Sequence, residues 1–155
     1  MKTKEEKQQA KHFLNLAGEY GVCSELQKRG VYANTVYGNK KATDIIIVKD
    51  KRAFTIEVKT SMENKIVTSF FQKYITPEHT PRPDFWVIVH IDKKTLSTDF
   101  YVFTHEEMAK AQMSRNNMTE WYVSEGRKKG VCSILVPQIQ QYKNKWETII
   151  NIVGK

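Results

Sequence analysis

Residues 54–61, FTIEVKTS, place a carboxylate and an amine two positions apart inside a run that otherwise has the pattern of a buried strand. Alternate residues of a strand share a face, so Glu57 and Lys59 lie together while Ile56 and Val58 point into the core on the other side. A solvated ion pair on an exposed hairpin is one explanation of this arrangement. The sequence just before it argues against that explanation.

The preceding run, TDIIIV at residues 43–48, is the natural partner strand, and residues 50–51 are the natural turn between the two strands. A short connection at this turn sets Asp44 directly across from Glu57. Opposed residues have Cβ atoms about 4.5–5.5 Å apart and share a face. Two carboxylates and Lys59 are therefore expected to converge on one patch.

Like charges that oppose each other destabilise a sheet, so this patch needs compensation. Lys59 supplies part of it, and a divalent cation supplies more. Two carboxylates with water completing the shell suit a hard ion such as Mg²⁺, or Mn²⁺ in its place. The metal polarises a phosphoryl oxygen and acidifies a bound water, while Lys59 steadies the developing negative charge. The predicted chemistry is metal-assisted phosphodiester hydrolysis, with Asp44, Glu57 and Lys59 as the catalytic residues.

Glu19 is a further candidate for the metal site. It lies on the apolar stripe of residues 16–26, at helical spacing, so it is expected to face the sheet. A buried carboxylate needs a partner, which a metal, a metal-bound water or Lys59 would provide. The alternative is a glutamate at the edge of the stripe that reaches solvent. Glu25 lies off the stripe and is expected at the surface.

The elements that would position these groups follow from periodicity and turn residues. A helix is expected over residues 1–29, ended by Gly30, with Gly18 and Gly21 as weak points that suggest a bend. Strands are expected at residues 31–37, 43–48, 53–60, 85–91 and 99–104.

Two further helices are expected. A capping box at Thr104 and Glu107 begins one that runs to about Gln112. The other follows Pro137, and its apolar stripe would pack on the sheet. Residues 114–130 are expected to be partly irregular. The fold class is α/β (α+β), a sandwich with a central mixed β-sheet flanked by helices, in a single domain over residues 1–155.

Asp44 followed after twelve residues by Glu57-Val58-Lys59 resembles the D…(D/E)xK signature of the PD-(D/E)xK, or restriction endonuclease-like, nuclease superfamily. The likeness extends over residues 18–61 as helix, strand, DIIIV strand and EVK strand. It is similar to archaeal-type Holliday junction resolvases, and looser beyond residue 61, where the order resembles uncharacterised bacterial members.

The resemblance implies a magnesium-dependent endonuclease. Asp44 and Glu57 would ligate the metal, the carbonyl of Val58 would join them, and Lys59 would be catalytic. Thr43 stands where the name of the motif has proline, a proline that is often absent.

The charge balance favours a polyanionic partner. Lysine and arginine number 25 against 17 aspartate and glutamate, which gives a net charge of +8. The runs GNKKAT and GRKKG place basic residues beside glycine, where backbone and charge can both approach phosphate. The candidate nucleic-acid-binding residues are Lys40, Lys41, Arg127, Lys128 and Lys129.

Three functional hypotheses stay open at this point. DNA cleavage is favoured, because a protein that only bound phosphate would gain nothing from opposed carboxylates. A non-cleaving nucleic-acid-binding module on the same fold and an RNA nuclease are the alternatives, and a homodimer is an open question. No long apolar run predicts a membrane span, and the charged N-terminal segment lacks a signal core, so a cytoplasmic location is expected.

Overall fold

The computed structural model describes residues 1–37, 43–74, 82–116 and 132–154. The helices are α1 (Lys4–Lys28), α2 (Phe70–Tyr74), α3 (His105–Arg115) and α5 (Glu147–Val153), with short 3₁₀ turns η1 (Val136–Gln138) and η2 (Gln140–Tyr142). The strands are β1 (Ala33–Thr35), β2 (Ile45–Lys49), β3 (Arg52–Ser61), β4 (Lys65–Val67), β5 (Phe85–Ile91), β6 (Thr98–Thr104) and β7 (Ser133–Leu135).

Helix α1 ends at the expected glycine and begins at a capping box that was not predicted. Thr3 caps its N-terminus through a capping box with Glu6. At the other end Gly30 has a φ of 78°, which glycine adopts without strain. The Val31 amide then reaches the Leu26 carbonyl at 3.0 Å and closes the helix. No helix in the described part of the chain is long and apolar enough to cross a bilayer.

The β2–β3 hairpin has the register that the turn predicts. Asp50 and Lys51 both have positive φ, 50° and 65°, as a two-residue type I′ turn requires. The ladder pairs Ile45 with Ile56 and continues to the turn without a slip. The strand pair and its facing pattern are therefore confirmed.

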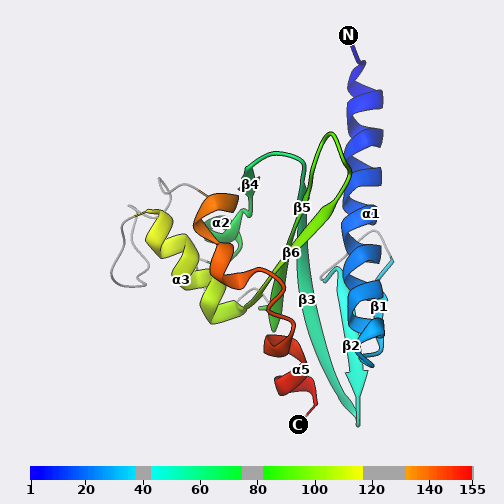
Figure 1. The fold of residues 1–155 in the computed structure, drawn as a ribbon, viewed down its shortest axis with the longest axis vertical. Coiled ribbons are helices and arrows are strands. Elements are labelled where there is room, and N and C mark those ends of the chain that lie inside the picture. Colours follow the sequence, from blue (N-terminus) through cyan, green and yellow to red (C-terminus); the bar gives the residue numbers. More distant parts are fainter. Residues whose placement is uncertain (38–42, 75–81, 117–131, 155) are drawn as a thin grey trace.

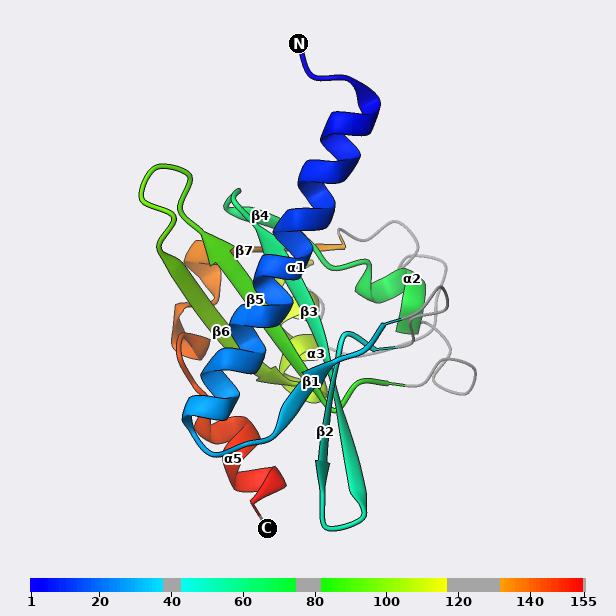
Figure 2. The same cartoon turned by 90° about the vertical axis from the view of Figure 1, so that its right-hand side faces the viewer.

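Five strands form the central mixed sheet in the order β1-β2-β3-β5-β6. Strands β3 and β5 are parallel, and the other neighbours are antiparallel. Helix α1 crosses one face, while α2, α3 and the small β4–β7 sheet lie on the opposite side (Figures 1 and 2). This arrangement confirms the expected fold class, a mixed sheet flanked by helices.

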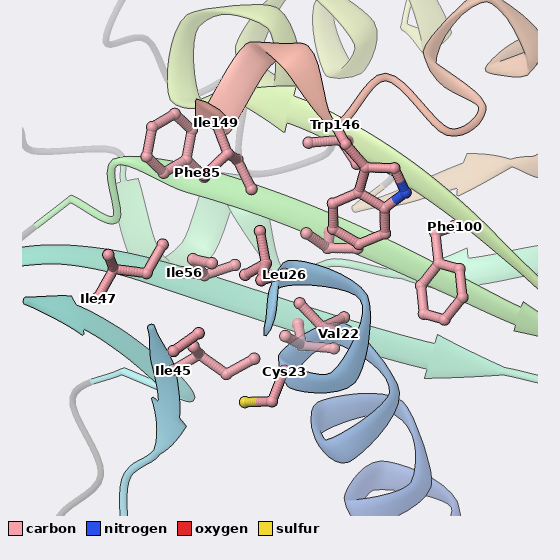
Figure 3. Packing of buried hydrophobic residues seen from close by; sticks show 14 of the residues in the cluster. Val22, Cys23, Leu26, Ile45, Ile47, Ile56, Phe85, Phe100, Trp146 and Ile149 are labelled. Atoms are coloured by element: carbon pink, nitrogen blue, oxygen red, sulfur yellow. The ribbon is translucent and has the colours of Figure 1, made fainter. Parts of the chain in front are cut away.

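The sheet separates two apolar cores. One lies between the sheet, α1 and α5, and Figure 3 shows Val22 and Leu26 of α1 packed against Ile45 and Ile56. The other lies under α2 and α3. Strand β5 feeds both cores, because its alternate residues point to opposite faces: Val87 belongs to the first core and Trp86 to the second.

The C-terminal segment differs from the single helix that was expected after Pro137. Two 3₁₀ turns come first. Asn144, with a φ of 53°, then interrupts the helical conformation before α5 begins. The predicted apolar stripe is divided between the cores: Ile139 packs in the core under α3, whereas Trp146 packs in the core under α1. Lys143 forms a bridge to Tyr101 of β6, so the segment passes around that edge of the sheet.

The two glycines of α1 lie where the helix packs closely on the sheet. A Cβ atom at Gly18 would lie 1.8 Å from Thr60 Oγ1 and 2.9 Å from Thr60 Cβ. The helix therefore rests directly on β3 at this point. At Gly21 a Cβ atom would meet only the end of the Phe100 ring, at 3.3 Å. The expectation of a weak point overlooked this contact, which no local pattern reveals.

Replacing Gly18 with alanine should destabilise the protein by about 1–3 kcal/mol, because the added methyl overpacks a rigid, β-branched neighbour. The free energy of unfolding in urea is the measurement. Gly21→Ala is the matched control and should be close to neutral. The higher helix propensity of alanine offsets the small cost of its contact with the Phe100 ring. Equal effects of the two changes would contradict the close contact with Thr60.

Candidate active site

Asp44 lies immediately before β2, beside the middle of β3. The regular ladder stops at Ile45 and Ile56, and the Asp44 amide donates to the Ile56 carbonyl at 3.2 Å. The Asp44 Oδ2 atom accepts from the Val58 amide at 2.8 Å. That amide belongs to the peptide linking Glu57 to Val58, so the Asp44 carboxylate sits one peptide unit from Glu57.

Glu57 is nearly buried, at 7% exposure, and two lysines hold the same carboxylate oxygen. Lys59 Nζ lies 2.8 Å from Glu57 Oε1, and Lys73 Nζ lies 2.9 Å from it. Lys59 comes from the same face of β3, as the alternation of the strand predicts. Lys73 comes from α2, which lies within the connection between β3 and β5. The pair expected between Glu57 and Lys59 is therefore present as part of a triad.

The two lysines determine the charge state of Glu57. Burial by itself raises the pKa of this carboxyl group, but the charges and hydrogen bonds of Lys59 and Lys73 outweigh burial and leave the pKa below its ordinary value. Lys59 makes the larger contribution of the two. A carboxylate inside the protein thus remains ionised because two cations stabilise it.

A cleft of about 430 Å³ opens next to this triad. Four of the predicted site residues line it: Glu19, Asp44, Val58 and Lys59. Lys65 of β4 and Lys11 of α1 add two further lysines to its wall. Glu57 is not part of the lining. It lies behind the cleft, linked to it through Lys59.

Glu19 faces inward, as its place on the helical stripe predicts. It is 7% exposed and lines the cleft, and the close contact of Gly18 with β3 sets this position. Burial, with the Glu19 charge adding to it, raises the pKa of the Cys23 thiol to about 11. Glu25, by contrast, forms ion pairs with Lys28 and Arg29 at the surface.

Helix α2 brings two residues to the site that the sequence did not identify. One is Lys73. The other is Tyr74, whose ring is 4% exposed and whose pKa is raised by burial and by the charges of both Glu57 and Asp44. Both carboxylates therefore act on one phenol. Lys73 could not be identified from the sequence, because α2 is too short to show a periodic pattern.

An aromatic cluster supports Tyr74 from behind. Its ring lies edge-on to His105, with 5.0 Å between the centroids, and His105 accepts from Trp86 Nε1 through Nδ1 at 3.2 Å. Burial lowers the pKa of His105, which agrees with a ring that accepts from Trp86. His105 is thus a core histidine, and Trp86 beside it is fully buried.

The carboxylates of the site are the kind of ligand that a hard cation takes, although they do not form a ready-made metal cluster. In the described ranges, no three side chains of His, Cys, Asp or Glu form a cluster that would hold a metal. Mg²⁺ keeps several waters and takes only one or two protein carboxylates, so Asp44 and Glu57 satisfy its requirement in kind and number. Both lysines contact the Oε1 atom of Glu57, so a cation that takes this oxygen must displace at least one of them.

The predicted nucleic-acid-binding residues all lie outside the described residues. Lys40 and Lys41 belong to residues 38–42, and Arg127, Lys128 and Lys129 belong to residues 117–131. Their role stays a prediction.

Comparison with known proteins relates the chain to others through its fold. No protein-family model matches it, and no curated protein sequence matches it significantly. A solved structure of a bacterial homing endonuclease, I-Ssp6803I, is similar, with a TM-score of 0.54 and 12% sequence identity. The match covers 99% of this chain and 96% of that chain. At this level of identity the likeness concerns the fold, and it agrees with the nuclease-like architecture expected from the sequence.

Removing the two lysines should reverse the shift of Glu57. In a Lys59→Met, Lys73→Met double variant, burial acts alone, so the pKa of Glu57 should rise above its ordinary value. Lys59→Met alone should raise it more than Lys73→Met alone. Carbon-13 NMR titration of the carboxyl groups is the measurement. Lys93→Met, which breaks an exposed pair with Glu63, is the control and should leave Glu57 unchanged.

The same shift fixes the sign of a pH effect on stability. Because the folded pKa of Glu57 is depressed, its contribution is present above the unfolded pKa and is lost as the pH falls through the folded pKa. A double variant that kept the wild-type stability profile between neutral and acid pH would contradict this account.

Proposed function

We propose that this chain is a metal-dependent endonuclease of the PD-(D/E)xK type, which hydrolyses phosphodiester bonds of DNA. The observation that carries the proposal is the placement of Asp44 on the Glu57–Val58 peptide, with Lys59 between Glu57 and the cleft. Carboxylates and a lysine with this connectivity, beside a cleft, suit phosphodiester hydrolysis.

Asp44 and Glu57 would hold Mg²⁺ or Mn²⁺, with the carbonyl of Val58 as a third ligand and Glu19 binding through water. When bound, the metal supplies Lewis acidity toward the phosphoryl oxygen and lowers the pKa of a coordinated water. Every other contribution comes from the chain. The Asp44 carboxylate is oriented by the Val58 amide, and this hydrogen bond fixes it at the end of the hairpin.

Lys59 is proposed as the catalytic lysine. Its ammonium group contacts Glu57, and the residue also lines the cleft, with a side chain that is 26% exposed. It could therefore donate to the attacking water or to the oxygen on which negative charge develops. Lys65, which also lines the cleft, adds positive charge that favours entry of a phosphate.

Two independent observations support nucleic acid as the substrate. The net charge of +8 favours a polyanion. The fold is similar to that of a homing endonuclease, which supports the class of reaction. Lys40, Lys41 and residues 127–129 are proposed to bind backbone phosphates. RNA in place of DNA is an outcome that a substrate panel would reveal.

One observation favours a second candidate, a binding module without cleavage. Glu57 is already neutralised by Lys59 and Lys73, which is also what a purely structural ion-pair network would show. On that hypothesis neither Asp44 nor Glu57 would bind metal, and the basic surface alone would account for any affinity.

Substitution of Asp44 or Lys59 separates the two candidates. Lys59→Ala should lower the rate of cleavage of plasmid, junction or single-stranded DNA in Mg²⁺ by roughly 10²–10³-fold, with binding nearly intact. Asp44→Ala should abolish cleavage and remove the Mn²⁺ isotherm in calorimetry. Asp99→Ala and Lys143→Ala, which break an exposed ion pair of 3.3 Å, are the matched controls and should keep both properties. A wild-type protein that neither cuts the panel nor binds Mn²⁺ would leave only the fold.

A further inference from the structure

The first part of α1 stands clear of the domain. Residues 1–13 are all exposed, while the helix itself continues without a break to Lys28. Figures 1 and 2 both show this end of α1 extending beyond the sheet. A segment of this kind receives little stabilisation from packing, because short isolated helices are marginal in water.

One face of α1 changes character along its length. The buried face follows three- and four-residue steps through residues 18–26, where it packs on the sheet. The same steps continued toward the N-terminus reach Asn15, Lys11, Gln8 and Lys4. All four side chains carry hydrogen-bond donors, and two carry a positive charge. We name these four residues the donor stripe.

The donor stripe runs out of the proposed active site. Lys11 and Asn15 line the same cleft as Asp44 and Lys59. Gln8 and Lys4 lie one and two turns further along the same face, beyond the edge of the cleft. The stripe is therefore a continuation of the cleft wall and not a separate patch.

The chemistry of this end of α1 does not suit an apolar partner. Between Thr3 and His12, Ala10 is the sole apolar residue, so no seam exists for a second helix. Two carboxylates are present. Glu6 is engaged with the Thr3 amide in the capping box, and Glu5 lies one position round the helix from Lys4. The stripe itself has no acidic residue.

We propose that the donor stripe binds the phosphate backbone of a nucleic acid whose scissile region lies in the cleft. This inference rests on the proposed function, since the cleft gives the stripe its direction. From Lys4 to Asn15 the helix rises about 16 Å, which corresponds to roughly five base pairs of duplex. The stripe thus extends the phosphate contacts away from the site of cleavage. A bound polyanion would also stabilise the exposed first part of α1, which packing against the domain does not stabilise.

The test is the salt dependence of binding to a short fluorescein-labelled DNA duplex, measured by anisotropy in EDTA so that nothing is cleaved. The variant is Lys4→Gln with Lys11→Gln. The matched control is Lys51→Gln with Lys110→Gln, which removes the same charge from exposed positions on the β2–β3 turn and on α3. The stripe variant should flatten the slope of log K against log salt by up to about 1.8, and the control should not. Lys4→Arg with Lys11→Arg should restore the slope.

Each other outcome overturns the proposal. Equal slopes for the stripe variant and the control would show that net charge alone matters. A wild-type protein that does not bind the duplex would also overturn it, as would sedimentation showing that the variant loses a dimer present in the wild type. Cleavage by the wild type distinguishes the stripe proposal from the proposed function. If the wild type cleaves DNA and the slope of the stripe variant is unchanged, the stripe proposal alone is wrong. If the stripe binds DNA and no cleavage occurs, the proposed nuclease function is wrong.

Discussion

The pairing of β2 with β3 is the constraint on which the site depends. Because side chains alternate across a sheet, a slip of one residue would move Glu57 and Lys59 to the face of α1. The type I′ turn at Asp50 and Lys51 prevents that slip, and its two residues with positive φ are compatible with one register. The same register brings Asp44 to the Val58 amide at the far end of the hairpin. A local turn therefore determines which groups meet at the cleft.

The burial of Glu57 imposes the next requirement. An ionised carboxylate with 7% exposure is stable only with close partners, and Lys59 on the same strand supplies one. The second partner, Lys73, comes through the crossover between the parallel strands β3 and β5, which carries α2 onto that face of the sheet. The position of α2 is itself set by packing of Phe70 and Tyr74 against Trp86. Electrostatics at the site and packing of the second core are thus coupled.

The parts of this molecule that were predictable are those with local signals. A continuous apolar run identified β5, alternation gave the shared face of Glu57 and Lys59, and helical spacing placed Glu19 inward. Contacts between distant segments were not predictable. The contact of Gly18 with Thr60 depends on how closely α1 approaches the sheet, and Lys73 depends on where a five-residue helix docks. The division of the C-terminal stripe between two cores was not predicted, for the same reason. An apolar period shows that residues are buried, but it does not show in which of two cores they lie.

The arrangement around Glu57 has a consequence for metal binding under the proposed function. One carboxylate oxygen contacts two ammonium groups, so a cation that takes this oxygen must displace at least one of them. Lys73 has the more exposed side chain, 41% against 26% for Lys59, and makes the smaller contribution to the lowered pKa of Glu57. Its release costs less, since water can solvate an exposed ammonium group more fully. Lys59 also lines the cleft, where a bound phosphate would offer its ammonium group a new partner. Under the proposed function, the two lysines would therefore hold Glu57 ionised until a metal bound, and their positions would favour exchange at Lys73 while Lys59 stayed beside the phosphate.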